Sequence, residues 1–478
     1  MSNRILSRFF LILFCVLTTS LLFSHAETKQ PIDLQKIDQY LQTKYEKGNI
    51  PGFAVAIVDS EAVLFSKGYG KNSDNQAITE DTPFAIASLS KAFTALSVMQ
   101  LVEAGEINLD DDIGKYLPVL SGKGITVRNL LNQTSGFSDI VFPEMKLYHQ
   151  PENLDEAINR LKDVPLATKP GEKYRYHNPN YTILAKLVEI VSGENFSDYL
   201  HQHIFQPLHM NHTADRAFTD NFYQIDHLPL PQGYNFILGY PVQLKEPEWF
   251  VEGSAGMLSS AADMANWMKL FLNEGVYGSD TLLSRAGIQQ MLTPPATNPY
   301  YGMGWALQPN GDISHNGMLW TSQSELLILK EKGYGIIVLF NSGLNIFENY
   351  NSFITGISDI LHEREPATPS FPTYWPELLI ALFLLLSVCL SLRQHKRIDK
   401  WERRYQSKFR FWLRITGMLI PLILLLLLPQ TVPFLSGRVL NWERTFWTMS
   451  SIVVLLGGVS LLNIGLIAKI FSVVFKKR

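Results

Sequence analysis

The sequence contains very little cysteine. Only two cysteines occur among the 478 residues, Cys15 and Cys389, and each lies in an apolar run near one end of the chain. Neither can cross-link the long region between them, which excludes a disulfide framework there. That region must be stabilised by its own hydrophobic core, and it is long enough to form one.

A strong excess of charge of one sign is also missing. Charged residues make up 18% of the chain, and the formal net charge is -3. Proteins that bind nucleic acid through its phosphates have a marked basic excess. No nucleic-acid partner is therefore expected. The length alone predicts about two or three structural units.

Long apolar runs are present, and the first is at the N-terminus. A basic start with Arg4 and Arg8 precedes an apolar run over residues 9–23, and the small residue Ala26 follows shortly afterwards. This pattern is typical of a secretory signal peptide covering residues 1–26. An uncleaved anchor helix is the alternative. In both cases the chain after Ala26 is delivered outside the cytoplasm.

Three further apolar runs lie near the C-terminus, at about residues 374–392, 415–435 and 446–468. The second and third are long enough to span a bilayer, and the first reaches that length with its aromatic flank. A Pro-rich linker, residues 366–373, precedes them and is expected to be extended. Residues 374–478 are therefore predicted to form a membrane domain of three transmembrane helices. Buried helices of a soluble domain are the alternative.

The charge of the connecting segments predicts the topology. Residues 393–414, between the first two runs, contain nine Lys or Arg against two acidic residues, whereas the next connection has only Arg438 and Arg444. Positively charged connections remain in the cytoplasm, so the first and third runs cross from outside to inside. Residues 27–373 then lie outside, in agreement with the export signal. The basic segment can also contact anionic lipid headgroups.

The middle of the chain combines strand and helix patterns. Residues 51–70 alternate around Asp59 as a hairpin of two strands does, and residues 33–47 are predicted to form a helix before it. Residues 110–295 indicate helices and loops. Strand patterns return later, and a closing helix follows, at residues 301–308, 321–330, 334–342 and 346–361. The predicted fold class is α/β (α+β), with an antiparallel sheet built from both terminal segments, flanking helices and a large, mainly helical insertion.

Ser88 and Lys91 are three residues apart where the pattern of Phe93, Leu96 and Met99 predicts a helix start. Residues at this spacing share one helix face, so the amine can reach the hydroxyl. Serine is a poor nucleophile until a base removes its proton, and lysine is such a base only when its pKa is lowered from about 10.4. The alternative is that Ser88 caps the helix and Lys91 is solvated.

Two later motifs add chemistry. Tyr176 and Asn178 form the single Tyr-x-Asn of the chain, and His315 and Gly317 the single His-x-Gly. A phenol is a second possible proton carrier, and a carboxamide can hold a substrate amide through both its donor and its acceptor. A glycine on a strand edge allows a substrate backbone to lie close beside it.

The three motifs, in this order, resemble the serine β-lactamase and penicillin-binding-protein superfamily, in its class C-like branch of esterases and D-peptidases. The phrases IPGFAVAIV, ITVRNLLNQTSGFSD, GSAGMLSSAADMANWM and YGMGW are similar to that branch as well. The resemblance covers residues 32–361 and leaves out the apolar C-terminal runs. It implies the β-lactamase/transpeptidase-like fold and an acyl-enzyme mechanism.

The resemblance also implies catalytic roles. Ser88 would be the acylated nucleophile, and Lys91 and Tyr176 would move its proton, with the main base left open between them. The backbone N–H groups of Ser88 and Met318 would form the oxyanion hole.

Substrate contacts follow from the same resemblance. Asn178 would hold the amide side of the substrate, and His315 and Gly317 would line the strand edge. His315 stands where β-lactamases and transpeptidases have lysine, which puts efficient β-lactam hydrolysis in doubt, because histidine is mostly neutral above pH 7. Gln133 stands where histidine is common, and a structural role is expected for it.

A metal site and a cofactor are not expected. The histidine-rich stretch near residue 205 suggests ligand spacing but has no acidic partner and no His-Glu-x-x-His pattern; its histidines are His201, His203, His209 and His212. The acidic run over residues 110–112 indicates a helix start.

These observations predict a membrane-anchored, extracytoplasmic serine hydrolase of a bacterial cell membrane. Its expected substrates are D-amino-acid peptides, including the stem peptides of peptidoglycan, or small esters. The first alternative is a sensor module that binds penicillin or peptide without turnover. The second is a scaffold that has kept the fold and lost the chemistry.

Overall fold

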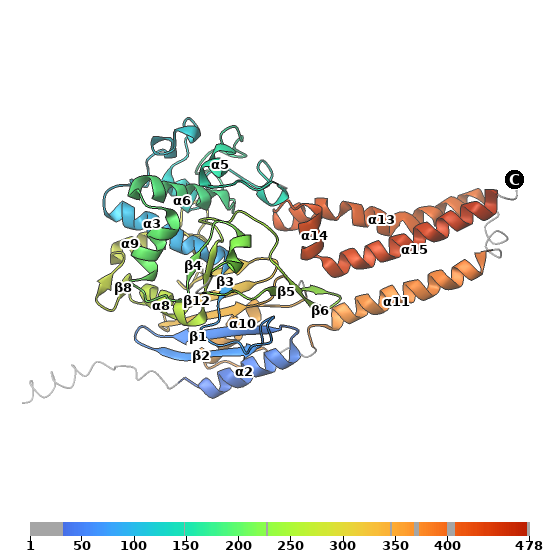
Figure 1. The fold of residues 1–478 in the computed structure, drawn as a ribbon, viewed down its shortest axis with the longest axis horizontal. Coiled ribbons are helices and arrows are strands. Elements are labelled where there is room, and N and C mark those ends of the chain that lie inside the picture. Colours follow the sequence, from blue (N-terminus) through green and yellow to red (C-terminus); the bar gives the residue numbers. More distant parts are fainter. Residues whose placement is uncertain are drawn as a thin grey trace, which may run out of the picture.

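The computed structural model describes residues 32–147, 149–225, 228–344, 347–367, 372–398 and 407–475. The expected signal peptide and residues 368–371 of the expected linker lie outside the described residues. The chain forms a layered body, from which a bundle of long helices projects on one side (Figure 1).

A six-stranded antiparallel sheet lies at the centre of the body. Its order is β10-β11-β12-β13-β1-β2, so that strands from the two ends of the domain pair in the middle, with Phe53 opposite Phe340. This confirms the predicted sheet. The strands are β1 (Gly52–Val58), β2 (Val63–Gly70), β10 (Ala306–Leu307), β11 (Ile313–Met318), β12 (Gln323–Leu329) and β13 (Tyr334–Phe340).

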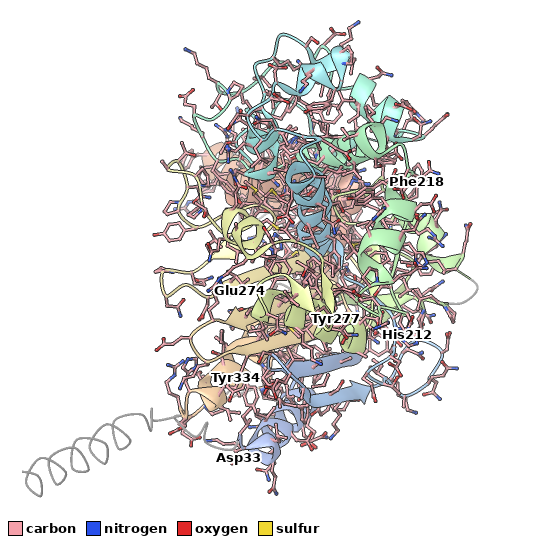
Figure 2. The ribbon with its side chains drawn as sticks, turned by 90° about the vertical axis from the view of Figure 1, so that its left-hand side faces the viewer. Asp33, His212, Phe218, Glu274, Tyr277 and Tyr334 are labelled. Atoms are coloured by element: carbon pink, nitrogen blue, oxygen red, sulfur yellow. The ribbon has the colours of Figure 1, made fainter. Side chains whose placement is uncertain are left out.

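Helices cover both faces of the sheet. On one face lie α2 (Leu34–Lys47), which begins after the capping residue Asp33, and α10 (Asn351–Leu361). On the other lie α3 (Ser90–Glu103) and α8 (Ala261–Leu272). Figure 2 shows Asp33 at the foot of the molecule, below the strands. Because strand side chains alternate, β1 directs large residues to α2 and α10 and small ones to α8.

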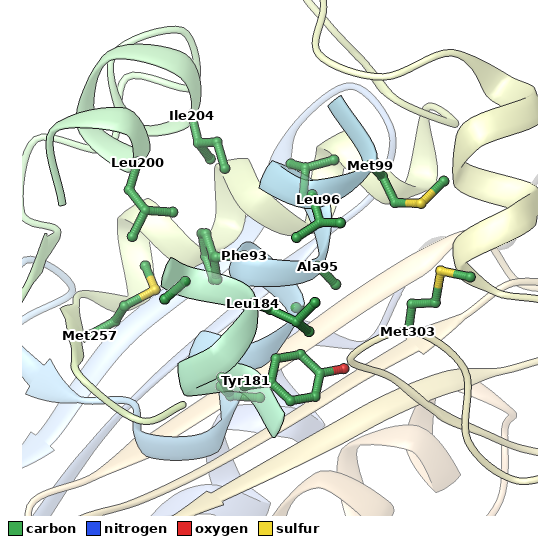
Figure 3. Close-up of a cluster of buried hydrophobic side chains, with 14 of the residues drawn as sticks. Phe93, Ala95, Leu96, Met99, Tyr181, Leu184, Leu200, Ile204, Met257 and Met303 are labelled. Atoms are coloured by element: carbon green, nitrogen blue, oxygen red, sulfur yellow. The ribbon is translucent and has the colours of Figure 1, made fainter. Parts of the chain in front are cut away.

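The helix α3 is buried on nearly every side. Phe93, Leu96 and Met99 pack in the main core against α6 (Pro179–Ser192), which contributes Tyr181 and Leu184 (Figure 3). The hydroxyl of Tyr181 donates to the carbonyl oxygen of Leu131 at 2.7 Å. The predicted helix after Ser88 is thus confirmed, and its packing holds its first turn in a fixed place.

The segment between β2 and β10 is mainly helical, as expected, but it also contains short strand pairs. The closing helix starts at Asn351, later than the predicted residue 346. The further elements of the segment between β2 and β10 are β3 (Phe84–Ala85), α4 (Val127–Leu131), α5 (Leu154–Asn159), α7 (Phe196–Leu200), β4 (Ala214–Asp215), β5 (Gly233–Ile237), β6 (Tyr240–Leu244), β7 (Met257–Ser259), β8 (Val276–Tyr277), β9 (Asp280–Thr281) and α9 (Arg285–Met291).

Three of the described helices are long and apolar enough to cross a membrane. They are α11 (Trp375–Lys396), α13 (Lys408–Ser436) and α15 (Ser450–Phe475), with mean hydropathy of 2.1, 2.2 and 2.3 over their most apolar windows. They lie side by side in the projecting bundle (Figure 1), and α15 packs on both α11 and α13.

A short helix, α14 (Trp442–Thr448), separates α13 from α15. The third apolar run predicts one continuous helix from residue 446, whereas Met449 has a non-helical φ of -136°. The β5–β6 hairpin explains the break. It accepts a hydrogen bond from the hydroxyl of Ser450 at the carbonyl of Phe236, and the N–H of Leu238 donates to the hydroxyl of Ser451 at 2.9 Å. The connection between α13 and α15 is thereby docked onto the body.

Candidate active site

Ser88 lies in a short 3-10 turn, Ala87–Leu89, immediately before α3. Ala87 has a φ of +50°, a left-handed conformation that is unfavourable for a residue with a Cβ atom. The hydroxyl of Ser90 stabilises this turn by donating to the carbonyl oxygen of Ala87 at 2.6 Å. The strained turn places Ser88, which is partly exposed, at the wall of a cavity.

Lys91 lies in the first turn of α3, and its side chain is completely buried. Its Nζ donates to Ser88 Oγ at 3.1 Å and to the carbonyl oxygen of Ser254 at 2.8 Å. Burial, and after it the charge of Arg438, hold the pKa of Lys91 well below its usual value, while the charge of Glu144 acts in the opposite direction. The lysine is therefore not the solvated residue that the alternative reading requires.

Tyr176 lies in the loop before α6, with its ring 4.8 Å from Lys91 Nζ. Burial raises the pKa of Tyr176 to about 12, while its hydrogen bond with Ser88 and the charge of Arg438 act to lower it. Both predicted proton carriers thus contact the same hydroxyl.

Asn178 is the residue before α6, and Pro179 at the first helical position fixes where this helix begins. Asn178 Nδ2 donates to Glu144 Oε1 at 2.7 Å. Its Oδ1 is buried and has no hydrogen-bond partner among the described residues. Glu144 therefore fixes the carboxamide of Asn178 at the cavity wall, with its oxygen buried and unpaired.

His315 is buried in β11 beside the ring of Tyr176. Burial, with the charge of Lys91, lowers the pKa of His315 to about 4, so the ring is neutral at pH 7. Its Nδ1 lies 2.7 Å from the carbonyl oxygen of Asn316 and must donate to it. Nε2 is then an acceptor for the hydroxyl of Tyr301, at 3.4 Å.

Gly317 lies where β11 passes the turn that contains Ser88. A Cβ atom at this position would stand 2.1 Å from the carbonyl oxygen of Ile86, 2.3 Å from Ser324 Oγ and 3.1 Å from Ala87 Cβ. Only glycine permits this approach. The close approach that Gly317 permits in the structure is thus between β11 and the turn that contains Ser88, whereas the sequence predicts an approach by a substrate backbone.

The N–H of Met318 points toward the open edge of the sheet. Leu319 donates to the carbonyl oxygen of Ser322 at 2.9 Å, so the preceding pair, Met318 and Gln323, is a non-hydrogen-bonded pair in the alternating ladder. Since β10 pairs with β11 at residues 313–314, the later part of β11 is open on that side. This orientation suits one half of an oxyanion hole.

A cavity of about 1060 Å³ brings these groups together. Ser88, Tyr176, Asn178, His315 and Met318 line it, although they come from three distant segments of the chain. Lys91 and Gly317 lie behind this wall rather than in it.

Three charged residues at the cavity were assigned no role from the sequence: Asp139, Glu144 and Arg438. Arg438 Nη1 lies 3.1 Å from Asp139 Oδ2 and 3.6 Å from Glu144 Oε1. The one sequence signal is that Arg438 interrupts a short connection between apolar runs where basic residues are scarce. Asp139 ends the family-like phrase ITVRNLLNQTSGFSD, whereas nothing in the sequence near Glu144 predicts its position.

Gln133, the other departure from the motif pattern, fastens the loop that contains Tyr176. Its Oε1 accepts from the N–H of His177 at 3.0 Å and from Asn180 Nδ2 at 2.6 Å. Its carbonyl oxygen accepts from the N–H of Arg175 at 2.8 Å.

The histidine-rich stretch contacts separate partners. His203 Nε2 lies 2.9 Å from Glu194 Oε1, and His212 Nδ1 lies 3.7 Å from Asp81 Oδ1 at the surface (Figure 2). The described part of the chain contains no group of three or more His, Cys, Asp or Glu placed to bind a metal.

Known proteins are similar over this body. A family model described as Beta-lactamase matches residues 37–350. Protein flp of Staphylococcus aureus (strain MW2) is 31% identical over 321 residues, which cover 64% of this chain and 63% of that protein, less than two thirds of its length. Penicillin-binding protein 4* of Bacillus subtilis (strain 168) is 28% identical over 320 residues, covering 61% of this chain and 68% of that protein.

A solved structure agrees with these matches. The octameric penicillin-binding protein homologue from Pyrococcus abyssi has a TM-score of 0.61 at 25% identity, covering 73% of this chain and 82% of that one. The predicted resemblance is confirmed by sequence and by fold. The chain therefore belongs to the β-lactamase family, within the serine β-lactamase and penicillin-binding-protein superfamily.

Proposed function

We propose that the protein is a membrane-anchored, extracytoplasmic serine hydrolase that acts through an acyl-enzyme on D-amino-acid peptides or small esters. The observation that supports it most is the buried amine of Lys91, 3.1 Å from Ser88 Oγ. A lysine with a lowered pKa is neutral for a larger share of the time and can accept a proton.

Acylation uses the groups around the cavity. Ser88 Oγ attacks the substrate carbonyl carbon while its proton passes to Lys91, and Tyr176 contacts the same oxygen. The N–H groups of Ser88 and Met318 hold the oxyanion. The intermediate collapses to a Ser88 ester as the leaving group departs with the proton.

Deacylation reverses these roles. A water molecule attacks the Ser88 ester and gives one proton to Lys91, and the acid product leaves as that proton returns to Ser88 Oγ. Lys91 is the better candidate for the main base, because its pKa is moved toward neutrality while that of Tyr176 is moved away from it.

The substrate class rests on the cavity and on the relatives. Asn178 Oδ1 has no partner among the described residues and would accept from a substrate N–H if it became accessible from the cavity that Asn178 lines, which favours a peptide-like acyl group. The neutral His315 leaves the strand edge without a positive charge of its own. Relatives named penicillin-binding proteins support D-alanyl peptides as the first candidates. Residues 27–365 would face the cell envelope, with three membrane spans below them.

A sensor without turnover remains the second candidate, because one observation favours it. The connection between α13 and α15 lines the same cavity as Ser88, so an acyl group there could act directly on the membrane helices. The two candidates differ in whether the acyl group leaves.

The test uses the full chain in detergent with a chromogenic ester, a D-Ala-D-Ala peptide and a fluorescent penicillin. The hydrolase predicts repeated turnover that Ser88→Ala abolishes while the unfolding temperature is kept. Ser60→Ala, an exposed turn residue, is the matched control and should behave as wild type. A stoichiometric adduct without turnover would favour the sensor. No adduct and no turnover would contradict both.

A further inference from the structure

The connection between α13 and α15 forms part of the wall of the catalytic cavity. Val432 near the end of α13, then Arg438, Leu440 and Met449, line the same cavity as Ser88. The connection is fixed there by several contacts. They include Trp320 Nε1 to Thr448 Oγ1 at 3.2 Å, Arg444 Nη2 to the carbonyl oxygen of Glu248 at 2.9 Å, and the hydrogen bonds of Ser450 and Ser451.

Arg438 lies at the centre of this contact. Its Nη1 is 3.3 and 3.1 Å from the two carboxylate oxygens of Asp139, and its guanidinium carbon lies 5.2 Å from the ring centroid of Tyr176. The side chain is 21% exposed and lines the cavity. A planar guanidinium suits both contacts, because it can bind a carboxylate and stack on an aromatic ring.

The contact extends to Asn178 through Glu144. Glu144 Oε1 accepts from Asn178 Nδ2 at 2.7 Å and lies 3.6 Å from Arg438 Nη1. Asp139 and Glu144 are both buried acids, and their mutual repulsion is opposed by the one guanidinium between them. Without it, one acid would have to take up a proton or turn away, and the amide of Asn178 would lose its fixed partner.

We infer that Arg438 is a positioning residue of the active site, which holds Tyr176 directly and Asn178 through Glu144, so that the connection between two membrane helices completes the catalytic unit. This rests on the proposed function of Ser88. The third membrane helix then has a purpose that anchoring alone would not require.

The charge of Arg438 acts on the proton carriers as well. It is the largest effect after burial in lowering the pKa of Lys91, and it lowers the pKa of Tyr176. His315 is neutral, so Arg438 provides the positive charge near the base. The other titratable groups that face Lys91, Tyr176 and Arg438 are Asp139, Glu144, Tyr174, His177, Tyr181, Tyr301 and His315.

The signs of two substitutions are opposite. Arg438→Gln removes a cation, so the pKa of Lys91 rises and the acid limb of kcat/KM moves to higher pH. Glu144→Gln removes an anion that raises the pKa of Lys91; burial raises the pKa of Glu144 itself to about 7, so the limb moves to lower pH where it lies above that value. The histidines and tyrosines are neutral in this range and do not reverse either sign.

The experiment measures kcat/KM from pH 5 to 10 for the full chain in detergent with a chromogenic ester. Arg438→Gln should shift the acid limb upward by about one pH unit and reduce kcat/KM at pH 7 by about tenfold or more. Arg438→Lys should keep the limb near its wild-type place, because the charge remains. Arg285→Gln, at an exposed ion pair with Glu274, is the matched control and should change neither quantity.

Several outcomes decide the inference. Wild-type rates and an unmoved limb in Arg438→Gln would overturn it, as would a shift of the same sign in Glu144→Gln. If Arg438→Gln does not fold, Arg438→Lys decides: an unchanged kcat would overturn it, because lysine lacks the planar fork. If the wild type does not turn over, the proposed function fails. In that case, the rate at which a fluorescent penicillin or a fluorophosphonate labels Ser88 is measured over the same pH range, and its dependence on Arg438 tests the inference. If Ser88 is not labelled at all, the proposed function and the inference are both overturned.

Discussion

Two lysines are buried in the body, and their surroundings are opposite in charge. Lys44 in α2 lies 3.7 Å from the buried carboxylate of Glu348 and donates to Ser352 Oγ at 2.7 Å. Lys91 in α3 contacts a hydroxyl and a carbonyl oxygen, with Arg438 as an additional nearby cation. Burial lowers the pKa of both amines, but Glu348 counteracts it at Lys44 and Arg438 strengthens it at Lys91.

The difference between Lys44 and Lys91 shows that burial alone does not turn a lysine into a general base. A buried amine beside a carboxylate forms a structural ion pair, here between α2 and the residues that lead into α10, and losing one partner of such a pair is costly. A buried amine beside a hydroxyl, with a second cation near it, is driven to the neutral form that can accept a proton. Substituting each lysine in turn tests whether its surroundings, rather than its burial, decide between a structural and a catalytic role.

Lys91→Met should have the largest effect. We expect kcat/KM to fall by about 10³-fold, because Ser88 loses its proton acceptor. In the wild type, the pKa of Lys91 is lower in the folded chain than in the unfolded chain, where it is about 10.5. Between these two values the unfolded chain binds a proton at Lys91 and the folded chain does not. The free energy of unfolding therefore falls as the pH drops through this range. The variant lacks this loss and should not be less stable. Near-normal turnover, followed with the chromogenic ester, would remove Lys91 from the mechanism.

Lys44→Met should leave turnover unchanged and reduce the free energy of unfolding by about 3 kcal/mol, because Glu348 loses its partner. Denaturant unfolding of the full chain in detergent measures it. The double variant with Glu348→Leu is the control and should recover most of the loss, since an apolar pair replaces an ionic one. A loss of catalysis with normal stability would erase the distinction between the two lysines.

Lys67→Ala, at a half-exposed lysine, should have the smallest effect. Lys67 Nζ lies 2.7 Å from Asp38 Oδ1, and the two side chains are 43% and 41% exposed. The free energy of unfolding should change by less than about 1 kcal/mol, and kcat/KM should stay as in the wild type. If Lys67→Ala reduced the free energy of unfolding as much as Lys44→Met does, the difference in exposure between the two lysines would not explain their effects on stability.

The sequence predicts the fold and the motif residues of the cavity wall because these depend on local patterns. The alternation around Asp59 predicts the β1–β2 hairpin, and the spacing of Ser88 and Lys91 depends on one helical turn. Gly317 is also visible in the sequence, although its reason is the close approach to Ile86.

The remainder depends on contacts between segments far apart in the chain. Arg438 reaches Asp139 across 299 residues, and the pairing of Lys44 with Glu348 likewise joins the two ends of the body. No periodicity or spacing encodes such pairs. The break at Met449 is hidden for the same reason, because the hairpin that causes it lies more than 200 residues away.

Val432 belongs to a helix stretch apolar enough to cross a bilayer, and it also lines the cavity that contains Ser88. On the proposed topology, the scissile bond must then descend almost to the lipid headgroups before it can be cut. Glycan strands or peptides held farther out in the wall would stay beyond reach however abundant they are, whereas newly exported material still close to the lipid surface would be met first.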